Sequence, residues 1–392
     1  MTHHKVTDFQ ELIGAINQAL ADKTPLNVFS CATKQDFGQV TNIADSLDIS
    51  GLSGVMDYEP EELIITAHAG TPLAEIEKTL AEKGQMLAFE APHISHLYNK
   101  PHNGSIGGIL ATNLSGPRRI SAGAARDFLL GFEAVSGRGS AFRSGSKVVK
   151  NVTGYDLSKL LCGSFGTLAI MDEITLKVLP APETSISLLV AAKDLATAGQ
   201  AARKAFQSPY EPSASAVLPR GVGDLSSSFD IAVIRLEGVA VSVNDRAERL
   251  QEMLAPYGLI ESLDDAKSRA LWASIRDGAP VLIDTGQIWR ISLAPTAGPD
   301  LVMQLQDKCD CKAMLDWSGG LVWLHTDTPE AHKMIRQVVA DCGGGHATCL
   351  RADTGLRSQI AVFEPIPDML ANLNKRIQNA FDPHAILNPG RI

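Results

Sequence analysis

The sequence has few aromatic side chains, no apolar run long enough for a membrane, and no basic stripe. Aromatic residues make up 5% of the 392 residues, charged residues make up 20%, and the formal net charge is −9. A membrane-spanning helix needs roughly 18–20 apolar residues, whereas the apolar runs here are strand-sized. The first ten residues, MTHHKVTDFQ, lack the apolar core of a signal peptide. The acidic balance argues against a nucleic-acid surface, and we expect a protein of the cytoplasm.

Cysteine usage gives no sign of disulfides or of a metal site. Six cysteines without a secretion signal are expected to be reduced thiols. Cys309, Cys311, Cys342 and Cys349, with His346 nearby, are residue types that bind metals. Their spacings fit no iron–sulfur run and no zinc-finger pattern, so we interpret them as buried or incidental thiols. We expect no metal.

The first half of the chain alternates helical and strand-like patterns. Apolar spacing predicts a helix over Asp8–Lys23 with Asp8 as N-cap, then a strand at Leu26–Phe29. Thr71 is expected to cap a further helix with Pro72 at its first position. A short helix is expected at Ile109–Leu114.

A break at Ala181-Pro182 separates this half from a second one of different texture. Strand-like runs such as Gln287–Leu293 alternate there with helical runs such as Leu195–Phe206. This alternation with uneven loops indicates a sheet with helices on one side. We therefore expect an α+β protein with domains at 1–181 and 182–365, and a C-terminal helix and tail at 366–392 that packs back on the first domain.

The glycine-rich run from Gly104 to Gly116 is the strongest chemical signal. The adjacent Gly107 and Gly108 allow a backbone to approach a ligand closely and open the short helix. Amide groups at a helix start attract anions, and a pyrophosphate fits that chemistry. The run is not a G-x-G-x-x-G fingerprint. The alternative interpretation is a glycine-rich surface loop that binds nothing.

Two further segments carry distinctive patterns. In Lys150–Leu168, glycines lie before and after a short expected helix near Tyr155–Cys162. Helix capping by glycine, without any ligand, also explains this pattern. The closing run F-D-P-H-A-I-L-N-P-G-R-I follows an expected helix. Isolated tails usually fray, so the apolar Ile386-Leu387 pair indicates that this one docks.

Together these segments resemble the FAD-binding domain of the vanillyl-alcohol-oxidase (PCMH) type. Four other runs resemble the smaller flavin subunit of glycolate oxidases: 84–93, 116–119, 289–295 and 315–324. The resemblance covers nearly the whole chain and is weakest over about 184–263. It implies two α+β subdomains that hold FAD, an α+β cap domain, and a tail that returns to the flavin.

The resemblance also implies the cofactor-binding residues. The family's first phosphate loop falls on Ser30, Cys31, Ala32, Thr33 and Lys34. Its second falls on Ser105, Ile106, Gly107 and Gly108. The other matching positions are Pro92, His93, Asn113, Gly116, Gly123, Arg126, Asp127, Gly154, Tyr155, Gly163, Ser164, Gly166, Thr167, Leu168 and Asn388.

The chain departs from this family in its first phosphate loop. Relatives carry glycines there, and none remains between Phe29 and Lys34. Residues other than glycine adopt positive φ at a penalty of about 1–2 kcal/mol, so weaker FAD binding is expected. Thr33 occupies the position where some relatives attach the flavin through histidine, so we expect non-covalent FAD.

A second departure concerns the substrate. Relatives that oxidise 2-hydroxy acids unaided carry the pattern H-x-G-D-G-N-x-H, which is missing here, as is any iron–sulfur motif. The resemblance then implies one subunit of a complex that oxidises glycolate to glyoxylate. The resemblance implies two partners, a larger flavoprotein subunit and an iron–sulfur subunit. An association with a membrane would come through that complex. Catalytic residues stay unassigned.

Two other functions stay open from the sequence. One is a stand-alone FAD-dependent oxidase of another 2-hydroxy acid or alcohol, which would turn over without a partner. The other is a structural subunit that binds no flavin, which the glycine-free first loop favours.

Overall fold

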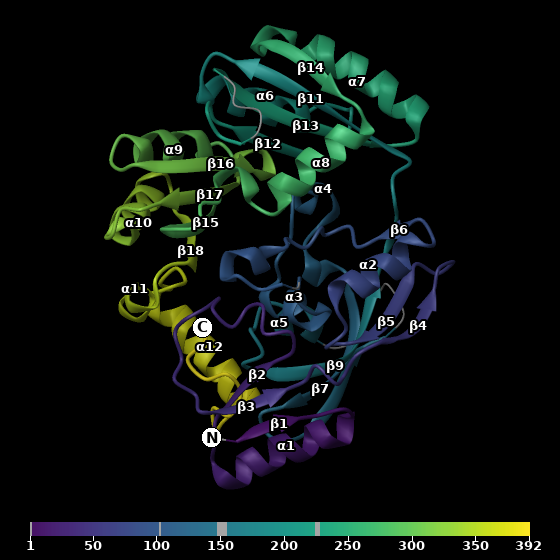
Figure 1. Ribbon diagram of the computed structural model, residues 1–392, viewed down its shortest axis with the longest axis vertical. Helices are drawn as coiled ribbons and strands as arrows, with labels where there is room; N and C mark the ends of the chain where they lie inside the picture. Colours follow the sequence, from purple (N-terminus) through teal and green to yellow (C-terminus); the bar gives the residue numbers. More distant parts are fainter. Residues whose placement is uncertain (1, 102, 147–154, 224–227) are drawn as a thin grey trace. The chain divides into compact units, whose positions relative to one another are not determined.

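The protein is described by a computed structural model that covers residues 2–101, 103–146, 155–223 and 228–392. It divides into two compact units. The first contains residues 1–115, 124–181 and 365–392, and the second contains 116–123 and 182–364 (Figure 1). Helices and strands are mixed in both units, and the predicted α+β class is confirmed.

The first unit begins with a small parallel sheet. Its strands are β1 (His3–Lys5), β2 (Leu26–Phe29) and β3 (Asp45–Asp48), in the order β1-β3-β2. The helix α1 (Phe9–Asp22) connects β1 to β2, and the Asp8 carboxylate caps it by accepting from the Glu11 amide, as predicted. Leu12 and Ile16 are fully buried, so one apolar face of α1 closes the core of this sheet.

The first unit also contains a five-stranded antiparallel sheet. Its order is β4-β5-β9-β7-β8, with β4 (Val55–Glu59), β5 (Ile64–His68), β7 (Leu129–Ser136), β8 (Ala141–Gly145) and β9 (Ala169–Lys177). A two-stranded ladder pairs β6 (Gln85–Met86) with β10 (Leu179–Pro180). The helices are α2 (Leu73–Ala81), α3 (Ile106–Thr112) and α5 (Leu157–Leu161), with short 3₁₀ turns at Ile94–Tyr98 and Ala125–Asp127.

The start of α2 differs from the prediction. Pro72 is the N-cap and makes no side-chain cap. Thr71 instead donates its hydroxyl to the Gly54 and His68 carbonyls, at 3.1 and 2.7 Å, and accepts from the Gly54 amide at 2.9 Å. Its hydroxyl therefore ties the turn after β5 and is not available to the helix.

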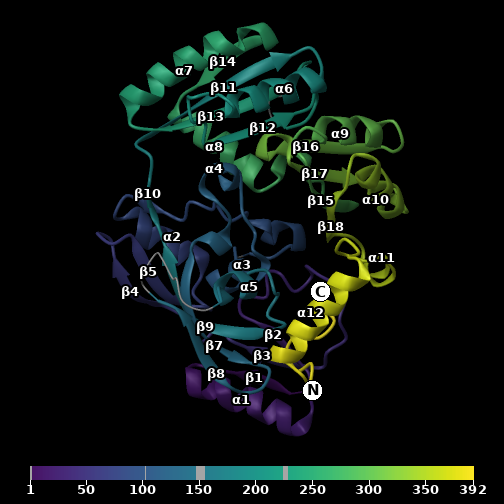
Figure 2. The same cartoon turned by 180° about the vertical axis from the view of Figure 1, so that it is seen from behind.

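The C-terminal tail pairs with β2. After α12 (Asp368–Phe381), the Leu26 amide donates to the Ile386 carbonyl at 2.7 Å and the Asn388 amide donates to the Leu26 carbonyl at 3.0 Å. Asp382 accepts from the Ile386 and Leu387 amides and so fixes the bend into the tail. Figures 1 and 2 both show α12 and β2 side by side.

The second unit is built on an eight-stranded antiparallel sheet in the order β14-β11-β13-β12-β16-β17-β15-β18. Its strands are β11 (Thr184–Ala192), β12 (Ala214–Leu218), β13 (Asp230–Gly238), β14 (Leu259–Leu263), β15 (Gln287–Leu293), β16 (Cys311–Asp316), β17 (Leu321–Thr326) and β18 (Gly345–Arg351). Its helices are α4 (Arg119–Ala122), α6 (Leu195–Phe206), α7 (Ala240–Leu254), α8 (Asp265–Arg276), α9 (Gly298–Gln306), α10 (Ala331–Asp341) and α11 (Thr354–Gln359).

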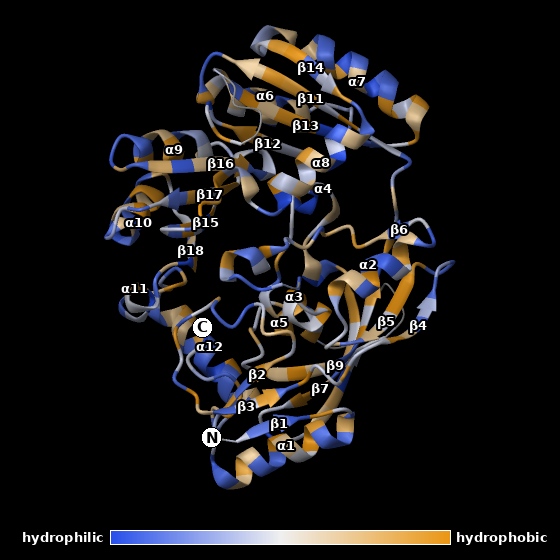
Figure 3. Cartoon of the chain, in the orientation of Figure 1, coloured by the Kyte–Doolittle hydropathy of each residue, from blue (hydrophilic) through white to orange (hydrophobic). Residues whose placement is uncertain are grey.

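One helix of this unit lies on the face that was expected to be bare. Leu188 and Val190 of β11 point into the core that α6 and α7 share. Ser187 points the other way, because side chains alternate along a strand, and it bonds to Ser268 and Trp272 of α8. Helices therefore cover both faces near β11, whose strong apolar colouring in Figure 3 is typical of a strand buried on two sides.

No helix in the described ranges combines the length and the apolar character that crossing a membrane requires.

Candidate functional site

A cleft of about 530 Å³ lies in the first unit, where three segments and the tail meet. The first segment is the loop after β2, the second is the start of α3, and the third is the loop that follows α5. Most of the positions predicted for a first and a second phosphate loop line this cleft. The residues that line this cleft include Val28, Ser30, Cys31, Ala32, Thr33, Lys34, Ser105, Gly108, Ala111, Thr112, Phe165, Asn388 and Arg391.

The first loop adopts the backbone that its sequence makes unfavourable. Ala32 has φ of 53°, in the left-handed region that glycine tolerates best. The expected strain of a glycine-free loop is therefore present at one residue. Such strain persists only where surrounding contacts fix the conformation, and Thr33 beside it is buried.

Lys34 brings a positive charge to the cleft. Lys34 as a whole is half-buried, and its Nζ lies 3.4 Å from the Thr33 hydroxyl, to which it donates. Burial lowers the pKa of Lys34 to about 8, an effect that Cys31 partly offsets. The residues described as lining the cleft include no carboxylate. A desolvated cation in an acid-free cleft fits an anionic group such as a pyrophosphate.

The second loop meets the prediction only in part. The Gly107 amide donates to the Ala69 carbonyl at 2.8 Å, and the Ile106 amide donates to the Thr71 carbonyl at 3.0 Å. These two amides hold the loop against the turn after β5, so they are not the free amide cradle that we expected. Ile106 is fully buried in the core.

The surroundings of the two adjacent glycines in this loop differ, and so does the requirement for glycine at each position. A Cβ on Gly107 would lie 2.7 Å from the Ala69 carbonyl oxygen, so close backbone packing requires glycine there. A Cβ on Gly108 would meet only the Ser105 hydroxyl at 3.6 Å and Lys34 Nζ at 3.9 Å. Gly108 and Ser105 therefore present the second loop to the same space as Lys34.

The loop after α5 forms another wall. Ser164, Phe165 and Gly166 line the cleft, whereas Thr167 and Leu168 are buried behind it. Gly163 lies at φ of 95°, and its amide donates to the Leu110 carbonyl of α3 at 2.9 Å. Phe165 was not among the predicted residues. Its aromatic side chain lies between the predicted residues Ser164 and Gly166, and this position in the sequence could have identified it as part of the site.

Asn388 connects the tail to two walls of the cleft. Its Oδ1 accepts from the Val28 amide at 2.7 Å, and its Nδ2 donates to the Phe165 carbonyl at 3.0 Å. Asn388 is 6% exposed and lines the cleft. Its predicted contact with the cofactor stays a prediction; in the structure its amide joins two walls of the cleft.

Several predicted residues do not line the cleft. Tyr155 is 91% exposed. Asn113 ends α3 with φ of 50°, and its Oδ1 accepts from the Arg126 amide at 3.1 Å, so its polar group is used within the fold. His93 contacts Asn103 at 3.1 Å. The lining of the cleft also does not include Pro92, Gly116, Gly123, Arg126 or Asp127. Gly154 falls outside the described residues.

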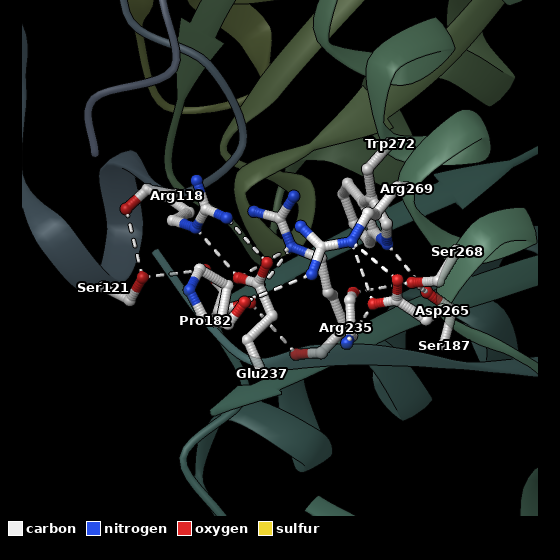
Figure 4. A network of polar contacts seen from close by, with 12 residues as sticks. Arg118, Ser121, Pro182, Ser187, Arg235, Glu237, Asp265, Ser268, Arg269 and Trp272 are labelled. Atoms are coloured by element: carbon white, nitrogen blue, oxygen red, sulfur yellow. Dashed lines mark hydrogen bonds and ion pairs between the residues drawn. The ribbon is translucent and has the colours of Figure 1, made fainter. Parts of the chain in front are cut away.

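Gly116 and Gly123 bound a segment that belongs to the second unit. Within it, Arg118 donates to both carboxylate oxygens of Glu237, at 2.6 and 2.8 Å, and Ser121 donates to the Ser213 carbonyl (Figure 4). Burial raises the pKa of Glu237, but Arg235 and Arg118 together lower it to about 2. Trp317 Nε1 donates to the Gly116 carbonyl at 2.9 Å. These contacts hold the 116–119 run in the second unit, and the predicted role of Gly116 and Gly123 at the flavin stays a prediction.

The described residues contain no group of three or more histidine, cysteine, aspartate or glutamate side chains that would hold a metal ion.

Comparison with known proteins identifies the family of this chain. Residues 4–145 match the FAD binding domain family. The chain is 34% identical over 386 residues to glycolate oxidase subunit GlcE of Escherichia coli (strain K12), which covers 98% of this chain and 97% of that protein. It is 27% identical to glycolate oxidase subunit GlcD of Bacillus subtilis (strain 168), over 87% of this chain and 77% of that one.

A solved structure shows the same fold. The p-cresol methylhydroxylase structure with bound substrate superposes with a TM-score of 0.74 at 16% identity and covers 99% of this chain and 88% of that one. Fold and cleft thus define a flavoprotein of the FAD-linked oxidoreductase class, with FAD as its cofactor. The chain belongs to the glycolate oxidase subunit family, and the predicted family and cofactor are confirmed.

Proposed function

We propose that this chain is the FAD-binding subunit of a glycolate oxidase complex and supports the oxidation of glycolate to glyoxylate. The observation that carries the proposal is the 34% identity to a glycolate oxidase subunit along nearly the full length of both chains. The acid-free cleft with Lys34 supports it, because it provides space and charge for the pyrophosphate of FAD.

The chain's own residues supply binding and orientation. Lys34, Ser105 and Gly108 would hold the phosphates, while Phe165 and Asn388 would shape the rest of the cleft. Bound FAD supplies the redox chemistry, accepting two electrons from an alcohol carbon. We propose that these electrons leave through an iron–sulfur subunit and that a larger flavoprotein subunit completes the complex.

The visible spectrum of the purified chain tests the cofactor part of this proposal. Bound flavin absorbs and fluoresces, and acid precipitation should release all of it because we expect no covalent link. A colourless protein that stays colourless after incubation with FAD would favour the structural subunit instead.

Glycolate-dependent reduction of a dye tests the reaction. We expect turnover when the chain is co-purified with its partner chains and little or none when it is alone. Full turnover by the isolated chain would favour a stand-alone oxidase. Turnover of the complex with this chain omitted would contradict its role.

A further inference from the structure

The last arginine of the chain lies beside the first loop. The Arg391 guanidinium donates through Nη2 to the Lys34 carbonyl, and the Arg391 carbonyl accepts from the Gln39 amide at 3.0 Å. A Cβ on Gly38 would lie 2.9 Å from that same carbonyl oxygen, so the tail is packed closely against the loop. Arg391 is thus held through both its side chain and its main chain.

Arg391 also lines the cleft together with Lys34. These two are the cationic residues described in the lining, which contains no aspartate or glutamate in the described part of the chain. The remaining lining residues are apolar, hydroxyl-bearing or glycine, apart from the Cys31 thiol and the amides of Gln35 and Asn388. A pyrophosphate diester carries one negative charge on each phosphate, so two cations in one acid-free cleft match it in charge.

A second cation at the cleft compensates for features of the two loops that limit their binding of an anion. The first loop contains no glycine, and Ala32 within it is in a left-handed conformation. In the second loop, the amides of Ile106 and Gly107 donate to protein carbonyls. The amides of Ile106 and Gly107 are therefore not available to an anion, and side-chain charge has to supply that part of the binding. Guanidinium groups bind phosphate oxygens through paired donors and stay charged at all relevant pH.

We propose that Arg391 is a phosphate-binding residue that completes, with Lys34, a two-cation site for the pyrophosphate of FAD. The inference rests on the FAD binding in the proposed function. The C-terminal tail then contributes charge to the cofactor site besides closing the fold. Its hydrogen bond to the Lys34 carbonyl also sets the positions of both cations relative to one another.

The test compares Arg391→Met and Arg391→Lys with Arg138→Met in the full-length chain. Arg138 is a matched control because it also holds carbonyls of the C-terminal segment, donating to Ala380 at 2.7 Å and to Asn379 at 3.1 Å, without lining the cleft. The measurement is the FAD dissociation constant, by flavin fluorescence, over about a tenfold range of salt, because screening weakens charge–charge attraction.

We expect Arg391→Met to weaken FAD binding by about 10- to 100-fold, the effect of losing a charged hydrogen bond. We also expect a shallower dependence of affinity on salt. Arg391→Lys should keep most of that salt dependence, and Arg138→Met should leave affinity and salt dependence as in the wild type.

Two results would overturn the inference. Unchanged FAD affinity in Arg391→Met is one. The other is weaker binding with an unaltered salt dependence, since that pattern assigns Arg391 only to fastening the loop. Failure of the proposed function looks different: a wild-type chain that takes up no FAD loses both proposals together, whereas normal FAD binding without glycolate turnover loses only the reaction.

Discussion

Asn388 donates its side-chain amide to the carbonyl of Phe165, a residue more than two hundred positions earlier in the chain. The same side chain accepts from Val28, so one amide group joins the tail, β2 and the loop after α5. Asn388 itself lies at φ of 44°, a conformation that asparagine tolerates better than most residues. The cleft walls therefore depend on a residue next to the C-terminus.

Replacing Asn388 with aspartate should open this connection. The carboxylate has no donor for the Phe165 carbonyl, and the buried carbonyl would lose its partner, which costs about 1–3 kcal/mol. We expect a lower midpoint of denaturant unfolding and weaker FAD binding. Asn372→Asp on the exposed part of α12 is the matched control and should change neither. Equal effects of both variants would refute a specific role for Asn388.

Ala32→Gly should stabilise the FAD-free protein. Alanine in the left-handed region costs about 1–2 kcal/mol, part of which is returned as the greater freedom of glycine in the unfolded chain. We expect a net gain of up to about 1 kcal/mol in the free energy of unfolding. Ala111→Gly, in α3 and on the same cleft, should have the opposite sign, with a loss of about 1 kcal/mol. If both substitutions destabilise, Ala32 is not strained.

Lys34 should make FAD affinity depend on pH. Its pKa is about 8 in the FAD-free fold, so above that pH the ammonium must regain a proton before it pairs with a phosphate. We expect the FAD dissociation constant to rise by up to about tenfold per pH unit above pH 8. The cleft lining also contains the Cys31 thiol and the Arg391 guanidinium, which stays charged. Lys34→Arg, which stays charged, should bind FAD without this inflection; an inflection that survives in that variant belongs to another group.

The stability of the FAD-free protein should change in the opposite direction. The pKa of Lys34 lies below its ordinary value of 10.5, so between pH 8 and 10.5 the unfolded chain binds more protons than the folded one. Stability from this group is therefore lowest below pH 8 and increases as pH rises through that window. Denaturant unfolding of wild type against Lys34→Arg across this range measures the difference, and a parallel pH dependence in the two proteins would contradict it.

The sequence predicts elements with a strong period and misses those without one. The helix at Leu195–Phe206 and the strand at Gln287–Leu293 were predicted with the observed limits, because apolar residues there recur at helical and strand spacing. The strand β12 (Ala214–Leu218) was missed: all five residues are buried, so no alternation marks it.

The site shows the same limit of local patterns. The glycine-rich and tail patterns contain residues that line one cleft, and its role as the FAD site stays a prediction. Phe165 and Arg391 were not assigned, since their place depends on how the tail folds back on the first loop. Gly116 and Gly123 were assigned to the path to the flavin, a role that stays a prediction. The segment between them is held by Glu237 and Trp317, through contacts between residues far apart in sequence.

Glu237 should contribute to stability down to acidic pH. Its carboxylate is 8% exposed and paired with Arg118 and Arg235, and its pKa is about 2 against an ordinary 4.5. A lowered carboxyl pKa gives stability that is complete above pH 4.5 and is lost as pH falls toward 2. Glu237→Gln leaves two buried guanidinium groups without this charge and should lower the free energy of unfolding near neutral pH by about 3–5 kcal/mol.

A second arginine–glutamate pair provides the control for this prediction. Arg143 also donates to both oxygens of Glu133, at 2.9 and 3.0 Å, but its side chain is 69% exposed. Solvent screens such pairs, so Glu133→Gln should cost about 0–1 kcal/mol. Unfolding by denaturant from pH 7 to pH 3 should show the gap between the two variants narrowing as Glu237 takes up its proton. If Glu237→Gln lowers the free energy of unfolding no more than Glu133→Gln does, the buried pair stabilises the protein no more than the exposed pair.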